Sequence, residues 1–210
     1  MNTQSILDFI ESLGIIVASV TATLGLYAWR KEVKWKRRNE VAEEILYNLY
    51  DVRDRLRAIR HPFAHPSEGE TRLVTKLESV EEKTIRNYAY TTVERYNNNR
   101  EPFLNLEKLK HRYAIYFGHK NASSITNIIF LKNEIISASY KYAQRSIERD
   151  KLIKKNLGEG YIQNQINALD TQIEKYASII WEKYEDDDAI SSAIDETIAN
   201  QEIVLNKYVK

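Results

Sequence analysis

The feature that most limits how this chain can fold is an uninterrupted apolar segment near its start. Residues 12–29, SLGIIVASVTATLGLYAW, are eighteen consecutive positions without a charged side chain. As an α-helix this segment would be about 27 Å long, close to the roughly 30 Å hydrocarbon thickness of a bilayer. Its length and composition predict either one membrane span or a helix buried in the core of a protein.

The charges on either side of this segment favour the membrane span. Asp8 and Glu11 precede it, and no Lys or Arg occurs before Arg30. A group of six cations then follows within nine residues, and we call it the basic collar: Arg30, Lys31, Lys34, Lys36, Arg37 and Arg38. A secretory signal peptide carries its positive charge before the apolar run, so we expect an uncleaved anchor. The positive-inside rule places the collar in the cytoplasm and the amino terminus outside, in a single-pass protein of the inner (cell) membrane.

Aromatic and small residues add detail to the predicted span. Three aromatic side chains fit the headgroup layer beside the collar: Tyr27, Trp29 and Trp35. A stripe of small residues recurs every four positions: Gly14, Ala18 and Ala22. Such a stripe allows two membrane helices to approach closely, so a homodimer, or an oligomeric pore, is an open alternative to a monomeric anchor. The collar cations can also bind anionic lipid headgroups.

Composition predicts that the rest of the chain is all-α. Three Pro and six Gly in 210 residues are few for a fold with many tight turns. From residue 39 onward there are 25 basic and 27 acidic residues, a balance that argues against nucleic acid as the partner. The absence of cysteine excludes disulfides and thiolate chemistry. We therefore expect residues 1–38 to form the anchor with its collar, and residues 39–210 to form one cytoplasmic antiparallel helical bundle.

The first cytoplasmic helix is expected to continue from the anchor. Its apolar residues alternate in steps of three and four: Ala42, Ile45, Leu49, Val52, Leu56 and Ile59. This spacing predicts one apolar face that packs on later helices of the same chain. A parallel coiled-coil dimer is the alternative, because Gly14, Ala18, Gly25 and Ala28 share the seven-residue register, although Glu32 and Asn39 interrupt it.

Helix-capping and helix-breaking residues predict the bounds of five further helices. We expect one from Thr71 to about residue 96, with Leu73, Leu77, Val80 and Tyr88 facing inward. The others are expected at residues 102–117, from Ser123 or Ser124 to about 156, from 162 to about 185, and at 189–207 after the acidic run EDDD.

The stretch LRAIRHPFAHPSEGETR, residues 56–72, holds the only candidate reaction centre. Arg60 is followed five positions later by His65, a spacing that resembles the Arg-x4-6-His motif of HEPN ribonuclease domains. The resemblance implies an all-α fold in which Arg60 stabilises phosphate charge and His65 transfers a proton during metal-independent RNA cleavage. A zinc site at His61, His65, Glu68 and Glu70 is disfavoured, because Pro62, Pro66 and Gly69 break the helical spacing. The same breaker residues favour a simple connector between two helices.

These observations lead to two functional hypotheses. The first is a non-enzymatic, membrane-anchored interaction, scaffold or sensor module that needs no cofactor or metal and holds a protein partner at the cytoplasmic face. The second is a membrane-tethered HEPN-like ribonuclease or growth-inhibiting effector that uses Arg60 and His65.

Overall fold

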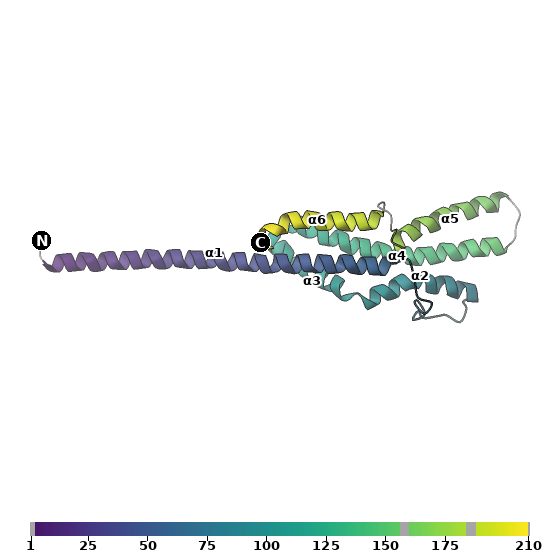
Figure 1. Ribbon diagram of the computed structural model, residues 1–210, viewed down its shortest axis with the longest axis horizontal. Helices are drawn as coiled ribbons and strands as arrows, with labels where there is room; N and C mark the ends of the chain where they lie inside the picture. Colours follow the sequence, from purple (N-terminus) through teal and green to yellow (C-terminus); the bar gives the residue numbers. More distant parts are fainter. Residues whose placement is uncertain (1–2, 156–159, 184–187, 210) are drawn as a thin grey trace.

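The computed structural model describes residues 3–155, 160–183 and 188–209. Within these ranges there are six helices and no strand. The helices are α1 (Thr3–Arg60), α2 (Val80–Asn98), α3 (Glu101–Phe117), α4 (His119–Lys154), α5 (Gly160–Ile180) and α6 (Ala189–Val209). As predicted, the protein is an all-α helical bundle, and the first half of α1 projects from it alone (Figure 1).

Helix α1 is continuous from the apolar segment into the bundle. Residues 7–38 are exposed on every side, whereas burial begins at Val41 and follows one face to the end of the helix. The predicted apolar stripe is confirmed, because each of its members is almost completely buried: Ala42, Ile45, Leu49, Val52, Leu56 and Ile59. This stripe packs against α6, α3 and α2 of the same chain. Burial of each Leu or Ile side chain contributes about 1.5–3 kcal/mol, so the stripe supplies much of the force that closes the bundle.

Helices α3 and α6 run antiparallel to α1. At one end of α3, Arg55 donates to Asn99, and near the other end Arg112 forms a 2.8 Å ion pair with Glu44. Helix α6 has the same direction as α3, since Asp188 before its start pairs with Arg60, whereas Glu202 near its end accepts from the Tyr50 hydroxyl at 2.6 Å. Both helices therefore end beside the point at which the exposed half of α1 leaves the bundle (Figure 1).

Helix α4 lies at the centre of the packing. It contacts α2, α3, α5 and α6, and with α5 it forms a hairpin that extends away from the projecting end of α1 (Figure 1). The core that joins these elements includes Phe103, Leu106, Tyr113, Ile125 and Ile128, which are nearly inaccessible to solvent. One connected hydrophobic core of this kind holds α1, α3, α4 and α6 together as a unit.

The second helix begins nine residues later than its sequence predicts. It starts at Val80 rather than Thr71, because Ser79 and Glu82 form a reciprocal capping box. Leu73, Leu77 and Val80 were expected to face inward, and this is wrong: they are 92%, 94% and 80% exposed. Tyr88 is 43% exposed, although its ring also packs 5.2 Å from the ring of Trp181.

The other helix boundaries differ less from expectation. The third helix and the last helix lie where predicted. The fourth begins at His119 rather than Ser123 or Ser124, because Gly118, at φ +88°, separates it from α3 with a single residue. The fifth helix ends at Ile180 instead of continuing through WEKYE. The expected end of the fourth helix at residue 156 and the acidic residues 185–187 lie outside the described residues.

Candidate functional site

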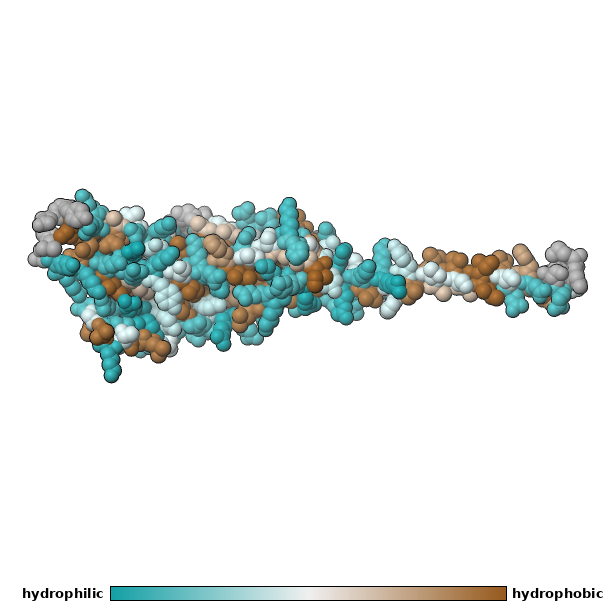
Figure 2. All heavy atoms as spheres, turned by 180° about the vertical axis from the view of Figure 1, so that it is seen from behind, coloured by the Kyte–Doolittle hydropathy of each residue, from teal (hydrophilic) through white to brown (hydrophobic). Residues whose placement is uncertain are grey.

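The projecting half of α1 exposes its apolar side chains to the surroundings. Within α1, an apolar stretch passes the length and composition criteria for one membrane span, and none of that stretch is buried inside the protein. Large side chains such as Ile16, Val20 and Leu24 are more than half exposed. Figure 2 shows this apolar band on the projecting helix, with hydrophilic residues between the band and the body. Residues 12–29 are therefore not a core helix of this chain, which was the second interpretation of the segment.

The serine and threonine hydroxyl groups of this segment are satisfied within the helix. Four side chains, Ser12, Ser19, Thr21 and Thr23, each donate to the carbonyl oxygen four residues earlier, at 2.8–2.9 Å. An unsatisfied polar group costs several kcal/mol in hydrocarbon, so these bonds remove most of the penalty for placing hydroxyls in a bilayer. The polar residues that lower the hydropathy of the segment thus remain compatible with a span.

The basic collar surrounds α1 immediately after the apolar band. Its cations are exposed, and Arg37 pairs with Glu40 at 3.0 Å one turn further along the helix. The aromatic residues predicted for the interface are also exposed: Tyr27, Trp29 and Trp35. Gly14, Ala18 and Ala22 are exposed as well, and a methyl group added at Gly14 would meet no atom within 4 Å. Nothing in the described chain covers this stripe, so the monomer leaves it open to lipid or to a second helix.

Arg60 is held in a buried hydrogen-bond network at the end of α1. Its guanidinium binds both carboxylate oxygens of Asp188 at 2.7 and 2.8 Å, and it also donates to Ser191. The remaining bonds go to the carbonyl oxygens of Ser178, Ile179 and Trp181, at 2.9–3.1 Å. Those carbonyls belong to the last turn of α5 and to Trp181, the residue that follows it; a helix end leaves such acceptors without internal partners. Arg60 therefore joins the ends of α1 and α5 to the start of α6.

Asp188 completes this network as the residue that precedes α6. Its carboxylate accepts from the backbone N–H of Ser191 at 2.8 Å and of Lys183 at 2.9 Å. Burial by itself would raise the pKa of Asp188, but the hydrogen bonds from Arg60 and from the two backbone amides outweigh burial and hold the pKa well below its usual range. The carboxylate is thus ionised at neutral pH, and the pair acts as a structural clasp, which we call the Arg60–Asp188 clasp.

His65 does not join Arg60 in a common site. Its side chain is exposed, and its Nδ1 lies 2.8 Å from the hydroxyl of Ser67. The Arg60 side chain is only 1% exposed, and its donors are used by the clasp and the α5 carbonyls. A phosphate would have to displace these partners to reach the guanidinium. The geometry gives no support to a catalytic Arg60–His65 pair.

The connector between α1 and α2 is attached firmly to α2. Arg95 donates to Glu68 at 2.6 Å and to the carbonyl oxygen of Phe63 at 2.7 Å. Gly69 lies at φ +84° against α2, where a Cβ would be 2.0 Å from the carbonyl oxygen of Asn87. Arg72 closes the last part of the connector through its ion pair with Glu78, which lowers the pKa of Glu78 to about 2. These contacts support the connector interpretation of residues 56–72.

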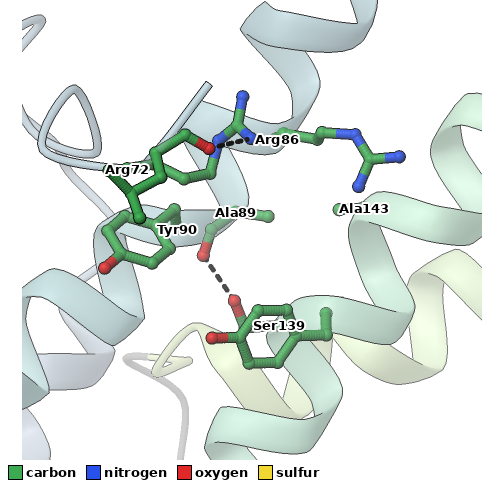
Figure 3. A pocket seen from close by; sticks show the side chains of 8 residues that line it. Arg72, Arg86, Ala89, Tyr90, Ser139 and Ala143 are labelled. Atoms are coloured by element: carbon green, nitrogen blue, oxygen red, sulfur yellow. Dashed lines mark hydrogen bonds between the residues drawn. The ribbon is translucent and has the colours of Figure 1, made fainter. Parts of the chain in front are cut away.

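Two cavities flank α2. One, of about 380 Å³, is lined by His65, Glu68 and Glu70 of the connector. The other lies between α2, α4 and the connector, with a volume of about 330 Å³. Arg72, Arg86 and Tyr90 line one side of it, and Ser139 and Ala143 line the other (Figure 3). The Ser139 hydroxyl donates to the carbonyl oxygen of Ala89 at 2.5 Å and so ties α4 to α2. The described lining of this second cavity contains no carboxylate or imidazole that could serve as a base. Among the described residues there is also no group of three or more His, Asp or Glu placed to hold a metal ion.

Sequence reasoning missed the clasp. Asp188 stands one residue before α6, a position at which Asp is favoured, and this is the local signal that could have identified it. Its pairing with a residue 128 positions away depends on how the helices pack, which no short motif encodes. Comparisons with protein-family models, curated proteins and solved structures give no match.

Proposed function

We propose that the protein is a single-pass membrane protein whose helical bundle is a non-enzymatic interaction or scaffold module at the cytoplasmic face of the inner membrane. The observation that carries this proposal is the projecting half of α1. An apolar helix long enough to cross a bilayer lies outside the bundle, with no side chain of that stretch buried by the rest of the chain. In water this surface would be a large exposed apolar patch, whereas in a bilayer it is solvated by lipid.

The order of charges supports the proposed orientation. Acidic Asp8 and Glu11 lie on one side of the apolar band, and the basic collar lies on the side that joins the bundle. The positive-inside rule then places the bundle in the cytoplasm. Because α1 runs without a break from the band into the core, the bundle would be held upright on its anchor rather than tethered by a flexible linker.

The chemistry of the described bundle supports a binding role. The buried Arg60 is used to join helices, and it is therefore withheld from the hollow beside α2 that His65, Glu68 and Glu70 line. The cavity beside Ser139 is lined by no carboxylate or imidazole. The fully exposed Leu73 and Leu77 at the far end of the bundle are instead apolar residues that a protein partner could cover. The stripe of Gly14, Ala18 and Ala22 offers a second place for association, with another copy of α1.

The proposal is tested by membrane insertion of matched arginine variants. Val20 lies at the centre of the apolar band and Val33 lies in the collar, and both are exposed on the same helix. Arginine at the centre of a span costs about 2.5–3.5 kcal/mol on insertion scales, and much less near the interface. Val20→Arg should therefore reduce the fraction of protein that stays with membranes after an alkaline wash, while Val33→Arg should not. Recovery of the unmodified chain in the wash would contradict the anchor.

A further inference from the structure

The end of the bundle that faces the collar is basic. We call it the base: it is formed by the α3–α4 junction and the C-terminal end of α6, next to the start of the buried part of α1. Phe117 and Tyr208 close it, with ring centroids 5.1 Å apart, and the Arg112–Glu44 ion pair connects α3 to α1 nearby. Figure 1 shows the C-terminus at this end, beside the point at which α1 emerges.

The segments that form the base contain no Asp or Glu. Residues 108–133, which include the end of α3 and the start of α4, contain five Lys or Arg and no Asp or Glu. Helix α6 has no acidic residue after Glu202, and it carries Lys207 in its last turn. Lys120 and Lys207 are both exposed. Further from the collar, in contrast, carboxylates are present and are matched by cations: Glu68, Glu78, Glu82 and Asp188 pair with Arg95, Arg72, Lys151 and Arg60.

The carboxylates that α1 brings to the base are largely occupied. Glu40 pairs with Arg37 at 3.0 Å, and Glu44 pairs with Arg112 at 2.8 Å. Glu43 accepts a hydrogen bond from Asn39. With two of these three charges neutralised by arginine, the cations of α4 and α6 dominate the field in front of the base.

Helix geometry sets the distance between the base and a membrane that holds the apolar band. From Trp29 to Val41, the first buried position, the helix rises about 18 Å. The headgroup layer occupies roughly 5–7 Å of this distance, so a gap of about 12 Å remains. Lysine side chains extend into the gap, and the usual helix tilt of about 20° brings one side of the base closer. The remaining separation is comparable to the Debye length of about 10 Å at 0.1 M salt.

We propose that the base is a second membrane-contact surface, at which Lys120 and Lys207 bind anionic lipid headgroups and fix the tilt of the bundle. This inference rests on the proposed anchor, because only an inserted α1 brings the base to the bilayer. The complementarity is electrostatic: a surface on which exposed lysines outnumber unpaired carboxylates meets the negative cytoplasmic leaflet. Each lysine near such a surface contributes about fivefold to the equilibrium between the docked and undocked orientations.

The test uses the full chain with one introduced cysteine, since the natural sequence has none. A fluorophore on Ser123→Cys reports from the base, one turn from Lys120, and a fluorophore on Ser192→Cys reports from the other end of α6. The protein is inserted into phosphatidylcholine vesicles, with or without phosphatidylserine, that contain a quencher on the lipid headgroups. Phosphatidylserine should increase quenching at position 123 and leave position 192 unchanged. Raising the salt to about 1 M, where the Debye length is about 3 Å, should remove the increase.

Matched lysine variants identify the residues responsible. The double variant Lys120→Gln/Lys207→Gln should lose the phosphatidylserine-dependent quenching at position 123. The control, Lys76→Gln/Lys83→Gln, removes the same charge from exposed sites at the far end and should keep it. If the two double variants respond alike, or if phosphatidylserine has no effect, the second contact surface is wrong. Flotation of the labelled protein with vesicles after an alkaline wash is scored separately, and its failure would overturn the anchor instead.

Discussion

Arg60 and Asp188 form a bidentate ion pair in which the two side chains are only 1% and 5% exposed and lie 128 positions apart in the sequence. Arg60 is the last residue of α1, and Asp188 directly precedes α6. The pair therefore links the far end of the helix that carries the apolar band to the C-terminal part of the chain. Since α5 is capped by the same guanidinium, three helix ends depend on one side chain.

Loss of the Arg60 side chain should destabilise the bundle strongly. Arg60→Ala leaves the carboxylate of Asp188 buried without its partner, and breaking a buried pair in this way costs about 3–5 kcal/mol. Arg145→Ala is the matched control, because Arg145 pairs with Glu148 at 2.6 Å on the surface of α4, where both side chains are more than a third exposed. Such a surface pair contributes little to the free energy of unfolding. Urea unfolding in detergent, followed by circular dichroism, measures both; equal losses for the two variants would contradict the clasp.

The clasp should also make the free energy of unfolding decrease as the pH is lowered into the acid range. The pKa of Asp188 in the folded protein is below its ordinary value, so the unfolded chain binds more protons as the pH falls through about 4. The stabilisation is complete above that pH and is lost as the pH falls toward the lower, folded-state pKa. Unfolding free energies measured between neutral pH and pH ~3 should therefore fall more steeply for the natural protein than for Asp188→Asn. Parallel curves for the two proteins would show that this carboxylate does not contribute.

Two glycines with nearly the same positive φ allow the cost of backbone strain to be compared with that of a steric clash. Gly69 has φ +84° and Gly118 has φ +88°, but an added Cβ would be 2.0 Å from the carbonyl oxygen of Asn87 only at Gly69. Alanine at such a positive φ costs roughly 1–3 kcal/mol at either position. Gly69→Ala should thus lose more unfolding free energy than Gly118→Ala, because the connector must also move away from α2. A loss at Gly69 no larger than that at Gly118 would mean that the connector is not pinned as described.

His65 should be dispensable for the behaviour of the protein in cells. Its imidazole is exposed and contacts Ser67, so His65→Ala should leave the unfolding free energy unchanged within about 0.5 kcal/mol. If the protein is a scaffold, cells that express the variant and cells that express the natural chain should also show the same growth and intact RNA. Growth inhibition or RNA cleavage by the natural chain that His65→Ala abolishes at equal protein levels would favour the ribonuclease alternative.

The sequence predicted the features that depend on local periodicity. The stripe from Ala42 to Ile59 and the last helix from Ala189 could be read directly, since helical spacing and turn residues report burial and helix ends. The start of α2 was misplaced because Thr71 and Ser79 are both acceptable caps, and only Ser79 has a glutamate three residues later that completes the box.

The role of Arg60 could not be predicted from local periodicity. An arginine at the end of a helix is usually exposed, and its burial here follows from the arrival of α5 and α6 at that point. Its nearness in sequence to His65 suggested a shared site, whereas the fold directs the two side chains to different partners. Long-range packing, rather than local pattern, decides this part of the structure.

The most direct test of the account is the topology of α1 in intact cells. Because the natural chain has no cysteine, Gln4→Cys and Ser123→Cys place single reactive thiols before the apolar band and in the bundle. A maleimide that cannot cross membranes should label Gln4→Cys in intact cells and label Ser123→Cys only after the cells are lysed. Labelling of both positions only after lysis, with the protein released by an alkaline wash, would contradict a membrane-spanning α1.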